Sequence, residues 1–175
     1  MTCTSCGIES QPGQKFCNHC GAALPAAESE PPPAPPPVSL HPIPDGGLTI
    51  EELRAWLENE GYAVKVVTGE SGKPHILTQT QGSPLNIFLG DCKGERCASL
   101  ELASGFSTHG QFDISQINAW NYDNRWCRAH YDDDKDPWLR MNIDLSPGGT
   151  YEALSERVDI WNRTLGRFIS TYSLK

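Results

Sequence analysis

The chain has 175 residues, a formal net charge of −8 and a sequence pI near 5.0. An acidic protein repels phosphate backbones, so a nucleic-acid partner is disfavoured without a strongly basic local patch. No run approaches the roughly 18 apolar residues of a membrane-spanning helix, and the N-terminus lacks a secretory signal. We therefore expect a cytoplasmic protein with no membrane partner, in which the seven cysteines are metal ligands or free thiols.

Two Cys-x-x-Cys-Gly motifs, CTSCG and CNHCG, occupy residues 1–24. Their cysteines are Cys3, Cys6, Cys17 and Cys20. Two such turns present four thiolates to one tetrahedral zinc ion, and the glycine after each pair tolerates the backbone twist of the turn. The ten residues between the motifs leave room for one short hairpin, with its turn at residues 11–13. The sequence therefore predicts a Zn²⁺ site at these four cysteines, and metal binding would supply the folding free energy of so small a segment.

This segment resembles the short zinc ribbons at the N-termini of many bacterial proteins, in which a phenylalanine such as Phe16 precedes the third cysteine. Ribbons that bind nucleic acid carry basic and aromatic residues on the hairpin. Lys15 is the only lysine or arginine before the next segment, and four thiolates around Zn²⁺ are net negative. We therefore expect a structural or protein-docking module, with His19 as a bystander because four cysteines complete the coordination.

Residues 25–45 are rich in proline and contain the run PPPAPPP. Proline clusters favour extended polyproline II, which predicts a semi-rigid spacer. PxxP matches occur in any proline cluster, so a spacer is favoured over a docking motif. The sequence thus predicts a zinc ribbon at 1–24, a linker at 25–45 and a larger domain at 46–175.

The larger domain is predicted to begin with a helix and several strands. Thr49 and Glu52 have capping-box spacing, and the amphipathic helix that follows ends at Gly61. Strand-like runs, separated by glycine and proline turns, then occur at 62–68, 75–80, 85–90 and 96–103.

The rest of the domain predicts two more helices and two more strands. Asp113 and Gln116 form a second capping box, and the helix that they begin leads into an alternating strand at 126–131. A strand at 138–145 follows, and apolar residues every three or four positions from Leu154 to Tyr172 predict a long helix that covers a sheet. This order of elements predicts an α+β domain with an antiparallel sheet and packed helices.

The hairpin LGDCKGERCASLEL and the segment INAWNYDNRWCRAHYD resemble the YbjN-domain family over roughly residues 46–175. The resemblance rests on Asn118, Trp120, Asn121 and Arg125. Members of this family are described as bacterial sensory transduction regulators. The resemblance implies a fold similar to the small dimeric chaperones of type III secretion, which are acidic α+β proteins that hold partner polypeptides and catalyse nothing. It also implies protein partners of unknown identity and a homodimer.

Cys92 and Cys97 flank the turn between two predicted strands, so a hairpin would bring their thiols face to face. A redox switch or a second metal site is one interpretation of this pair. Free thiols are the favoured interpretation, because a cytosol is reducing. Cys127 alternates with polar residues and is most simply a small core residue.

Other motifs give no catalytic constellation. The acidic run 132–136 lacks the glycine and glutamate of a calcium loop, and GESGKP lacks the first glycine of a phosphate loop. Ser107 and His109 lack nucleophile-elbow spacing, and His75 and His130 belong to different strands. The asparagines at three-residue spacing after Gln116 form either a recognition stripe or, as we favour, hydrogen bonds to the backbone where helix meets strand.

We therefore expect no enzyme. The sequence favours a non-catalytic, zinc-binding adaptor or regulator that binds protein in a chaperone-like or signal-transduction role. The alternatives are a nucleic-acid-associated regulator that uses the ribbon, and a thiol redox sensor at Cys92 and Cys97.

Overall fold

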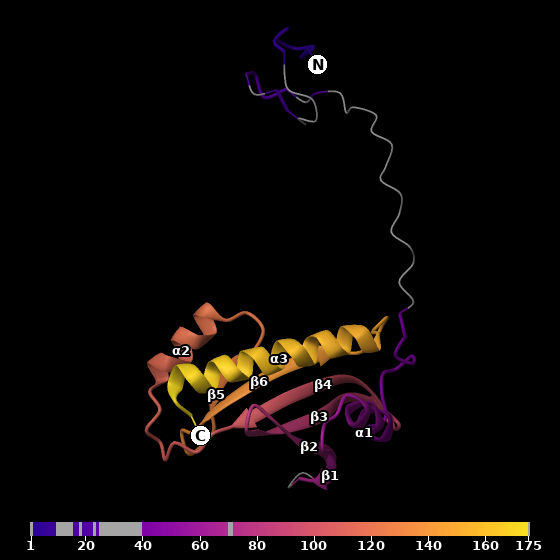
Figure 1. Cartoon of the computed structure of the whole chain (residues 1–175), viewed down its shortest axis with the longest axis vertical. Coiled ribbons are helices and arrows are strands. Elements are labelled where there is room, and N and C mark those ends of the chain that lie inside the picture. The colour runs from indigo at the N-terminus through magenta and orange to yellow at the C-terminus, as the bar shows by residue number, and fades with distance from the viewer. Residues whose placement is uncertain are drawn as a thin grey trace. The chain divides into compact units, whose positions relative to one another are not determined.

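A computed structural model describes residues 2–9, 16–17, 19–22, 24, 40–69 and 72–174. The chain divides into two units, Met1–Val38 and Ser39–Lys175, and each is described by itself (Figure 1). The expected hairpin turn at 11–13 and the proline run of the spacer lie outside the described residues. No helix in the described part of the chain combines the length and the apolar character that crossing a bilayer requires.

The second unit contains three α-helices, and all three begin at side-chain caps. The helices are α1 (Ile50–Asn59), α2 (Ile114–Asp123) and α3 (Tyr151–Tyr172). Both predicted capping boxes are present: Thr49 and Glu52 exchange hydrogen bonds at α1, and Asp113 and Gln116 do so at α2. Thr150 caps α3 by accepting a hydrogen bond from the Ala153 amide. These caps satisfy amides that the first helical turn leaves without partners.

Six antiparallel strands form one open sheet in the order β1-β2-β3-β4-β6-β5. The strands are β1 (Lys65–Thr68), β2 (Pro74–Thr80), β3 (Ser83–Lys93), β4 (Arg96–Gly105), β5 (Arg128–Tyr131) and β6 (Pro137–Asp144). The prediction of an α+β domain with an antiparallel sheet and packed helices is confirmed. Because β6 pairs with β4, the segment with α2 and β5 is an insertion that places β5 at the edge of the sheet.

One face of the sheet packs against the helices. Side chains alternate across a strand, and the register aligns Ile87, Leu102 and Met141 on the same face of β3, β4 and β6. These residues share one buried core with the apolar side chains of α1 and α3. In Figure 1, α3 lies along the sheet, with α1 and α2 near its opposite ends. The ring contacts agree, because Trp56 of α1 lies 6.4 Å from Tyr151 at the start of α3.

Phe168 is the hub of an aromatic cluster that joins α2 to the C-terminal half of α3. Its ring has no exposed surface, and its centroid lies 4.7 Å from that of Trp120 on α2. Its other aromatic neighbours are Phe106, Phe112 and Tyr172. The contacts with Trp120 and Tyr172 are edge-on, and such contacts add to the free energy that ring burial contributes.

Residues 41–43 extend the second unit beyond the boundary that we drew at residue 46. Pro42 forms an antiparallel bridge with Thr150, and the Ile43 amide donates to the Gly149 carbonyl at 2.9 Å. The Ile43 side chain is buried in the main core. Because prolines dominate this part of the sequence, the composition did not indicate that Ile43 packs in the core.

Strand β5 begins at Arg128, two residues after the position that the alternating pattern predicted. The Arg128 guanidinium donates to the carbonyls of Asn121 and Asn124 and so satisfies the C-terminal end of α2. This leaves Trp126 in the connecting loop, where 46% of it is exposed. Trp120 and Trp161, by contrast, are buried.

Candidate metal centre and other candidate sites

The two cysteine motifs of the first unit form turns with the same hydrogen-bond pattern. The Cys3 amide donates to the Ile8 carbonyl at 3.0 Å, and the Cys17 amide donates to the Ala22 carbonyl at 2.8 Å. Each turn is closed by a glycine amide that donates to the carbonyl of its first cysteine. Gly7 has a φ of 73°, a left-handed conformation that glycine adopts without strain.

The four cysteine sulfur atoms converge on one point between these turns, and all lie within 4.8 Å of one another. The distances between Sγ atoms are 3.7 Å for Cys3 and Cys20 and 3.7 Å for Cys6 and Cys17. A regular tetrahedron with metal–sulfur bonds of about 2.3 Å has edges of about 3.8 Å. The cluster therefore has the dimensions of a tetrahedral metal site, and the donor set fits a metal.

The electrostatics of the cluster favour a cation. The Ile8 backbone amide donates toward the Cys6 sulfur and alone would lower its pKa. Burial and the neighbouring thiols raise it more, and the pKa of Cys6 is about 12. A divalent cation among the sulfurs would therefore displace protons as it binds, which weakens metal binding at low pH.

His19, between the two cysteines of the second motif, is exposed. The exposed aromatic ring of this unit is Phe16, directly before Cys17. Lys15, on which the argument against nucleic acid partly rested, lies outside the described residues.

Cys92 and Cys97 form a disulfide at the end of the β3–β4 hairpin. The expectation of free thiols at these positions is wrong, whereas the expectation that the hairpin brings them face to face is confirmed. A two-residue turn sets the register, so the two cysteines are directly opposite each other, where the Cβ atoms are close enough for the two sulfur atoms to bond. Cys127 is a free, buried thiol as predicted, and burial raises its pKa to about 12.

The disulfide hairpin contacts the start of α1. The main chain of Cys97 pairs with that of Leu48, just before the helix. Arg96 donates to both carboxylate oxygens of Glu52 and to the Gly47 carbonyl. This guanidinium is the first cause of the lowered pKa of Glu52. The backbone at Gly47 passes so close to Cys97 that a Cβ would lie 1.9 Å from its carbonyl oxygen.

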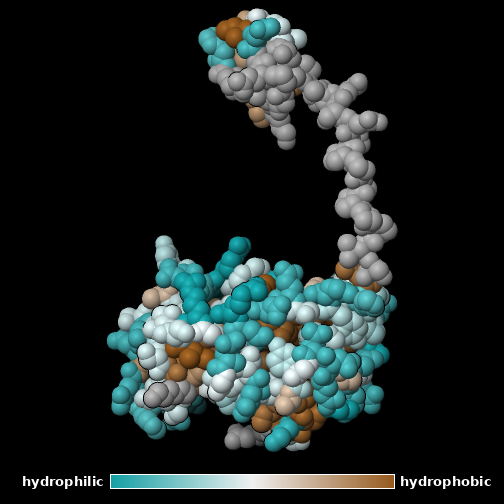
Figure 2. All heavy atoms as spheres, viewed as in Figure 1, coloured by the Kyte–Doolittle hydropathy of each residue, from teal (hydrophilic) through white to brown (hydrophobic). Residues whose placement is uncertain are grey.

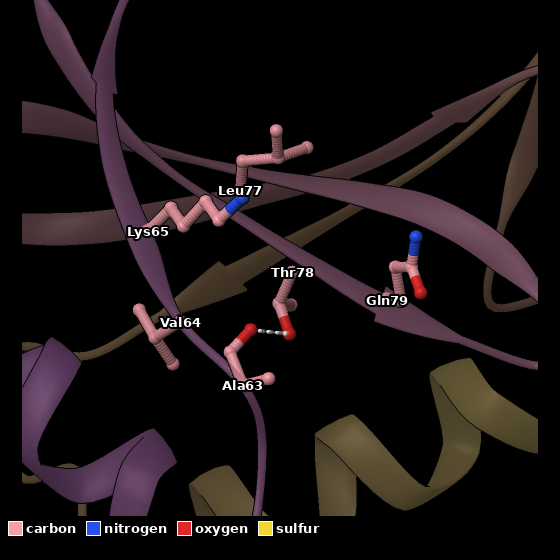
Figure 3. Close-up of a pocket in the computed structure, with 6 residues that line it drawn as sticks. All are labelled: Ala63, Val64, Lys65, Leu77, Thr78 and Gln79. Atoms are coloured by element: carbon pink, nitrogen blue, oxygen red, sulfur yellow. Dashed lines mark hydrogen bonds between the residues drawn. The ribbon is translucent and has the colours of Figure 1, made fainter.

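One pocket lies beside the disulfide hairpin, and another lies beside β1. A largely apolar pocket of about 520 Å³ lies between the start of α1 and the disulfide hairpin, and Ile50, Leu89 and both disulfide cysteines line it. A second pocket lies where the chain enters β1 beside β2 (Figure 3). There the Thr78 hydroxyl donates to the Ala63 carbonyl, and Lys65 is the titratable side chain of the lining.

The acidic run 132–136 forms a turn in which a carboxylate of the run accepts hydrogen bonds from backbone amides of the same turn. The Trp138 indole N–H and the amides of Asp134 and Asp136 donate to Asp132, whose pKa they lower. Asp136 accepts from the Thr108 amide, which lowers its pKa. Both oxygens of Asp132 and one oxygen of Asp136 therefore accept hydrogen bonds within or beside the turn.

The asparagines after Gln116 confirm in part the favoured interpretation. Asn121 donates to the Ala129 carbonyl and accepts from the Ala129 amide, so its side chain joins α2 to β5. Asn124 donates to the Trp120 carbonyl at the end of α2. Asn118 is exposed. His75 and His130 lie on β2 and β5, which are not neighbours in the sheet, so they form no pair.

The structure adds an arginine surface that sequence reasoning did not identify. It consists of Arg125, Trp126, Arg157, Arg163 and Arg167. These residues come from the α2–β5 loop and from α3, which cross at a pocket of about 330 Å³. The four-residue spacing of Arg163 and Arg167 on the last helix was the available sequence signal.

The comparisons with known proteins assign a family to the second unit. The model of the YbjN family, described as "Putative bacterial sensory transduction regulator", matches residues 49–172. No curated protein and no solved structure gives a match to this chain. The similarity to type III secretion chaperones therefore stays a prediction. The matched segment covers most of the chain and includes every helix and strand of the second unit, so the chain belongs to the YbjN family.

Proposed function

We propose that this protein is a non-catalytic regulatory adaptor, which holds a zinc ion in its first unit and binds protein partners in a chaperone-like or signal-transduction role. The observation that carries the metal-binding part is the convergence of four cysteine sulfurs at tetrahedral spacing. The family description supports the regulatory part, since it names a regulator rather than an enzyme.

Zinc is the metal that suits this donor set best. Zn²⁺ has no geometric preference of its own and takes four thiolates tetrahedrally in structural sites. Cys3, Cys6, Cys17 and Cys20 would hold it, and the ion would order the two turns. A structural site leaves no open coordination position, so it would not activate water or bind substrate.

The test of the protein-binding role is a crosslinked pull-down from the cytosol of the source organism, with the full chain and its Cys6→Ser variant as baits. We expect nuclease-resistant protein partners that crosslink to mapped positions on the bait. Retention by Cys6→Ser would place recognition in the second unit, and loss would place it in the zinc unit. Recovery of nucleic acid alone, or turnover of a metabolite that a point mutation abolishes, would overturn the proposal.

A second candidate function, thiol redox sensing, is favoured by the disulfide between Cys92 and Cys97. Cys92 is exposed and Cys97 is buried, so an incoming thiolate reaches the Cys92 sulfur. With a protein dithiol as reductant, its first thiolate bonds to Cys92 and the Cys97 sulfur leaves as a thiolate, which takes up a proton. The second thiolate of the reductant then attacks the reductant sulfur that is bonded to Cys92, and Cys92 departs as a thiolate. The reductant becomes a disulfide, so two electrons pass to the protein.

Reduction is expected to reach α1, because Cys97 and Arg96 hold the segment before that helix. We expect alkylation of Cys92 to rise as the chain is equilibrated with increasingly reducing glutathione buffers, and hydrogen exchange near residue 48 to rise with it. Cys92→Ser should abolish the redox dependence of the exchange. The sensor hypothesis would be rejected by a disulfide that forms and breaks with no change in exchange at α1.

A further inference from the structure

The arginines of this protein fall into two groups according to their partners. Among the described residues, Arg54, Arg96 and Arg140 pair with glutamates, and Arg128 donates to the carbonyls at the end of α2. The other four arginines are Arg125, Arg157, Arg163 and Arg167. In the described part of the chain none of these four forms an ion pair, and all four belong to the arginine surface.

Trp126 lies at the centre of this surface. The Arg157 guanidinium carbon is 4.8 Å from the centroid of its ring, and that of Arg125 is 5.3 Å away. These cation–π contacts hold the ring and both guanidinium groups in place before any ligand binds. On the side of the unit where Figure 1 places α2 and the loop after it, hydrophilic side chains project outward in Figure 2.

The pocket beside Trp126 is cationic and partly polar. Arg125, Arg163 and Arg167 line it together with Asn124 and Thr164. One carboxylate, that of Asp123, also lines it, so three guanidinium groups face one acid. In a chain with a net charge of −8, four arginines without an ion pair in the described residues form a local positive patch, which would attract an anionic partner.

We propose that the arginine surface binds an acidic segment of a protein partner. Guanidinium groups bind carboxylates through two parallel hydrogen bonds, which suits the aspartate and glutamate side chains of such a segment. Trp126 and Tyr122, which are 46% and 91% exposed, offer apolar contact area for a neighbouring side chain. Tryptophan, tyrosine and arginine are the residue types that dominate binding energy in protein interfaces. The inference rests on the proposed protein-binding role and specifies the chemistry of the partner.

A nucleic acid fits this surface less well. Single-stranded nucleic acid binds by stacking bases on open aromatic faces along a basic groove. The arginines of this surface gather around one pocket and the Trp126 ring and do not line a groove that could follow a strand. A nucleic-acid strand that extends beyond the pocket would also pass over the rest of a chain whose net charge is −8, which a short peptide segment would not.

The test uses the full chain and a short dye-labelled peptide of glutamate and leucine, with fluorescence anisotropy as the readout. We expect binding that weakens as salt rises and that is lost when glutamine replaces glutamate in the peptide. The double variant Arg163→Gln, Arg167→Gln should bind at least about tenfold more weakly. Both side chains are exposed, and glutamine keeps the helix propensity of arginine, so the fold should be retained. Arg54→Gln with Lys65→Gln removes the same charge elsewhere and should leave binding unchanged.

Equal peptide binding by the double variant and the full chain would overturn the proposal, as would tighter binding of an oligothymidine probe at the same surface. A change of oligomeric state in the double variant would make this surface a contact between copies of the chain and would also overturn it. The pull-down separates this inference from the proposed function. Partners that the double variant still recovers would leave the protein-binding role in place and reject the arginine surface as its site. A full chain that recovers no protein would reject the role itself.

Discussion

Replacement of Cys17 by serine is expected to abolish stoichiometric zinc binding and to unfold the first unit, while the second unit stays folded. A serine hydroxyl is a much poorer zinc ligand than a thiolate, and Cys17 is one of the two buried cysteines of the cluster. Zinc binding to small four-ligand sites supplies about 10–16 kcal/mol of apparent free energy at neutral pH. Besides the cysteines, the buried cluster of this unit contains only Leu24 and Ala22 among the described residues, which is far too little to replace that free energy.

The measurement combines zinc analysis of the purified chain with the amide spectrum of residues 2–24. We expect one zinc per chain in the unmodified protein, none after exchange into a strong chelator, and none in Cys17→Ser. His19→Ala is the matched control in the same motif, because His19 is exposed and is not expected to coordinate the ion. A Cys17→Ser chain that keeps one zinc with an unchanged spectrum would show that the four cysteines are not the ligands. The melting of the second unit should be unchanged, since its core shares no residue with the metal cluster.

The second large effect is expected for Phe168→Ala, which should lower the free energy of unfolding of the second unit by about 3–5 kcal/mol. The ring is fully buried and lies against Trp120 of α2 and Phe106 at the end of β4. Its removal leaves a cavity that three separate elements would have to close together. Because domains are stable by only about 5–15 kcal/mol, the variant should be close to unfolding.

Urea unfolding followed by tryptophan fluorescence measures this loss. Phe168→Leu keeps most of the apolar volume and should cost less than about half as much. Tyr122→Ala, at a residue that is 91% exposed, should change stability by no more than about 0.5 kcal/mol. A loss below about 1 kcal/mol for Phe168→Ala would mean that α2 and α3 do not depend on this contact.

Local signals predicted most of the fold, because each acts over a few residues. Thr49 with Glu52 and Asp113 with Gln116 cap their helices as their spacing indicated. The prediction of where β5 starts was less accurate. The start of this strand depends on hydrogen bonds that Asn121 and Arg128 form across the α2–β5 junction. Alternation alone carries no information about such bonds.

The candidate sites also divide into those that local sequence signals predicted and those that depend on contacts between distant segments. The four metal-site cysteines were found because ligand spacing is itself a local property of a turn. The disulfide required the exact register of a hairpin, and the arginine surface required α3 to pass beside the α2–β5 loop. Contacts between distant segments follow from tertiary packing, which one sequence pattern does not encode.

The lengths of the strands bear on whether the edges of the sheet can pair with a strand of another molecule. The two edge strands, β1 and β5, have four residues each, whereas β3 and β4 in the interior have 11 and 10. A short edge offers few unpaired amides and carbonyls to a strand from another molecule. Lys65 and Arg128 at these edges add charge that an incoming strand would have to bury. The long β3–β4 hairpin therefore lies in the interior of the sheet, and the strands at both edges are short and charged, which disfavours pairing with a strand of another molecule.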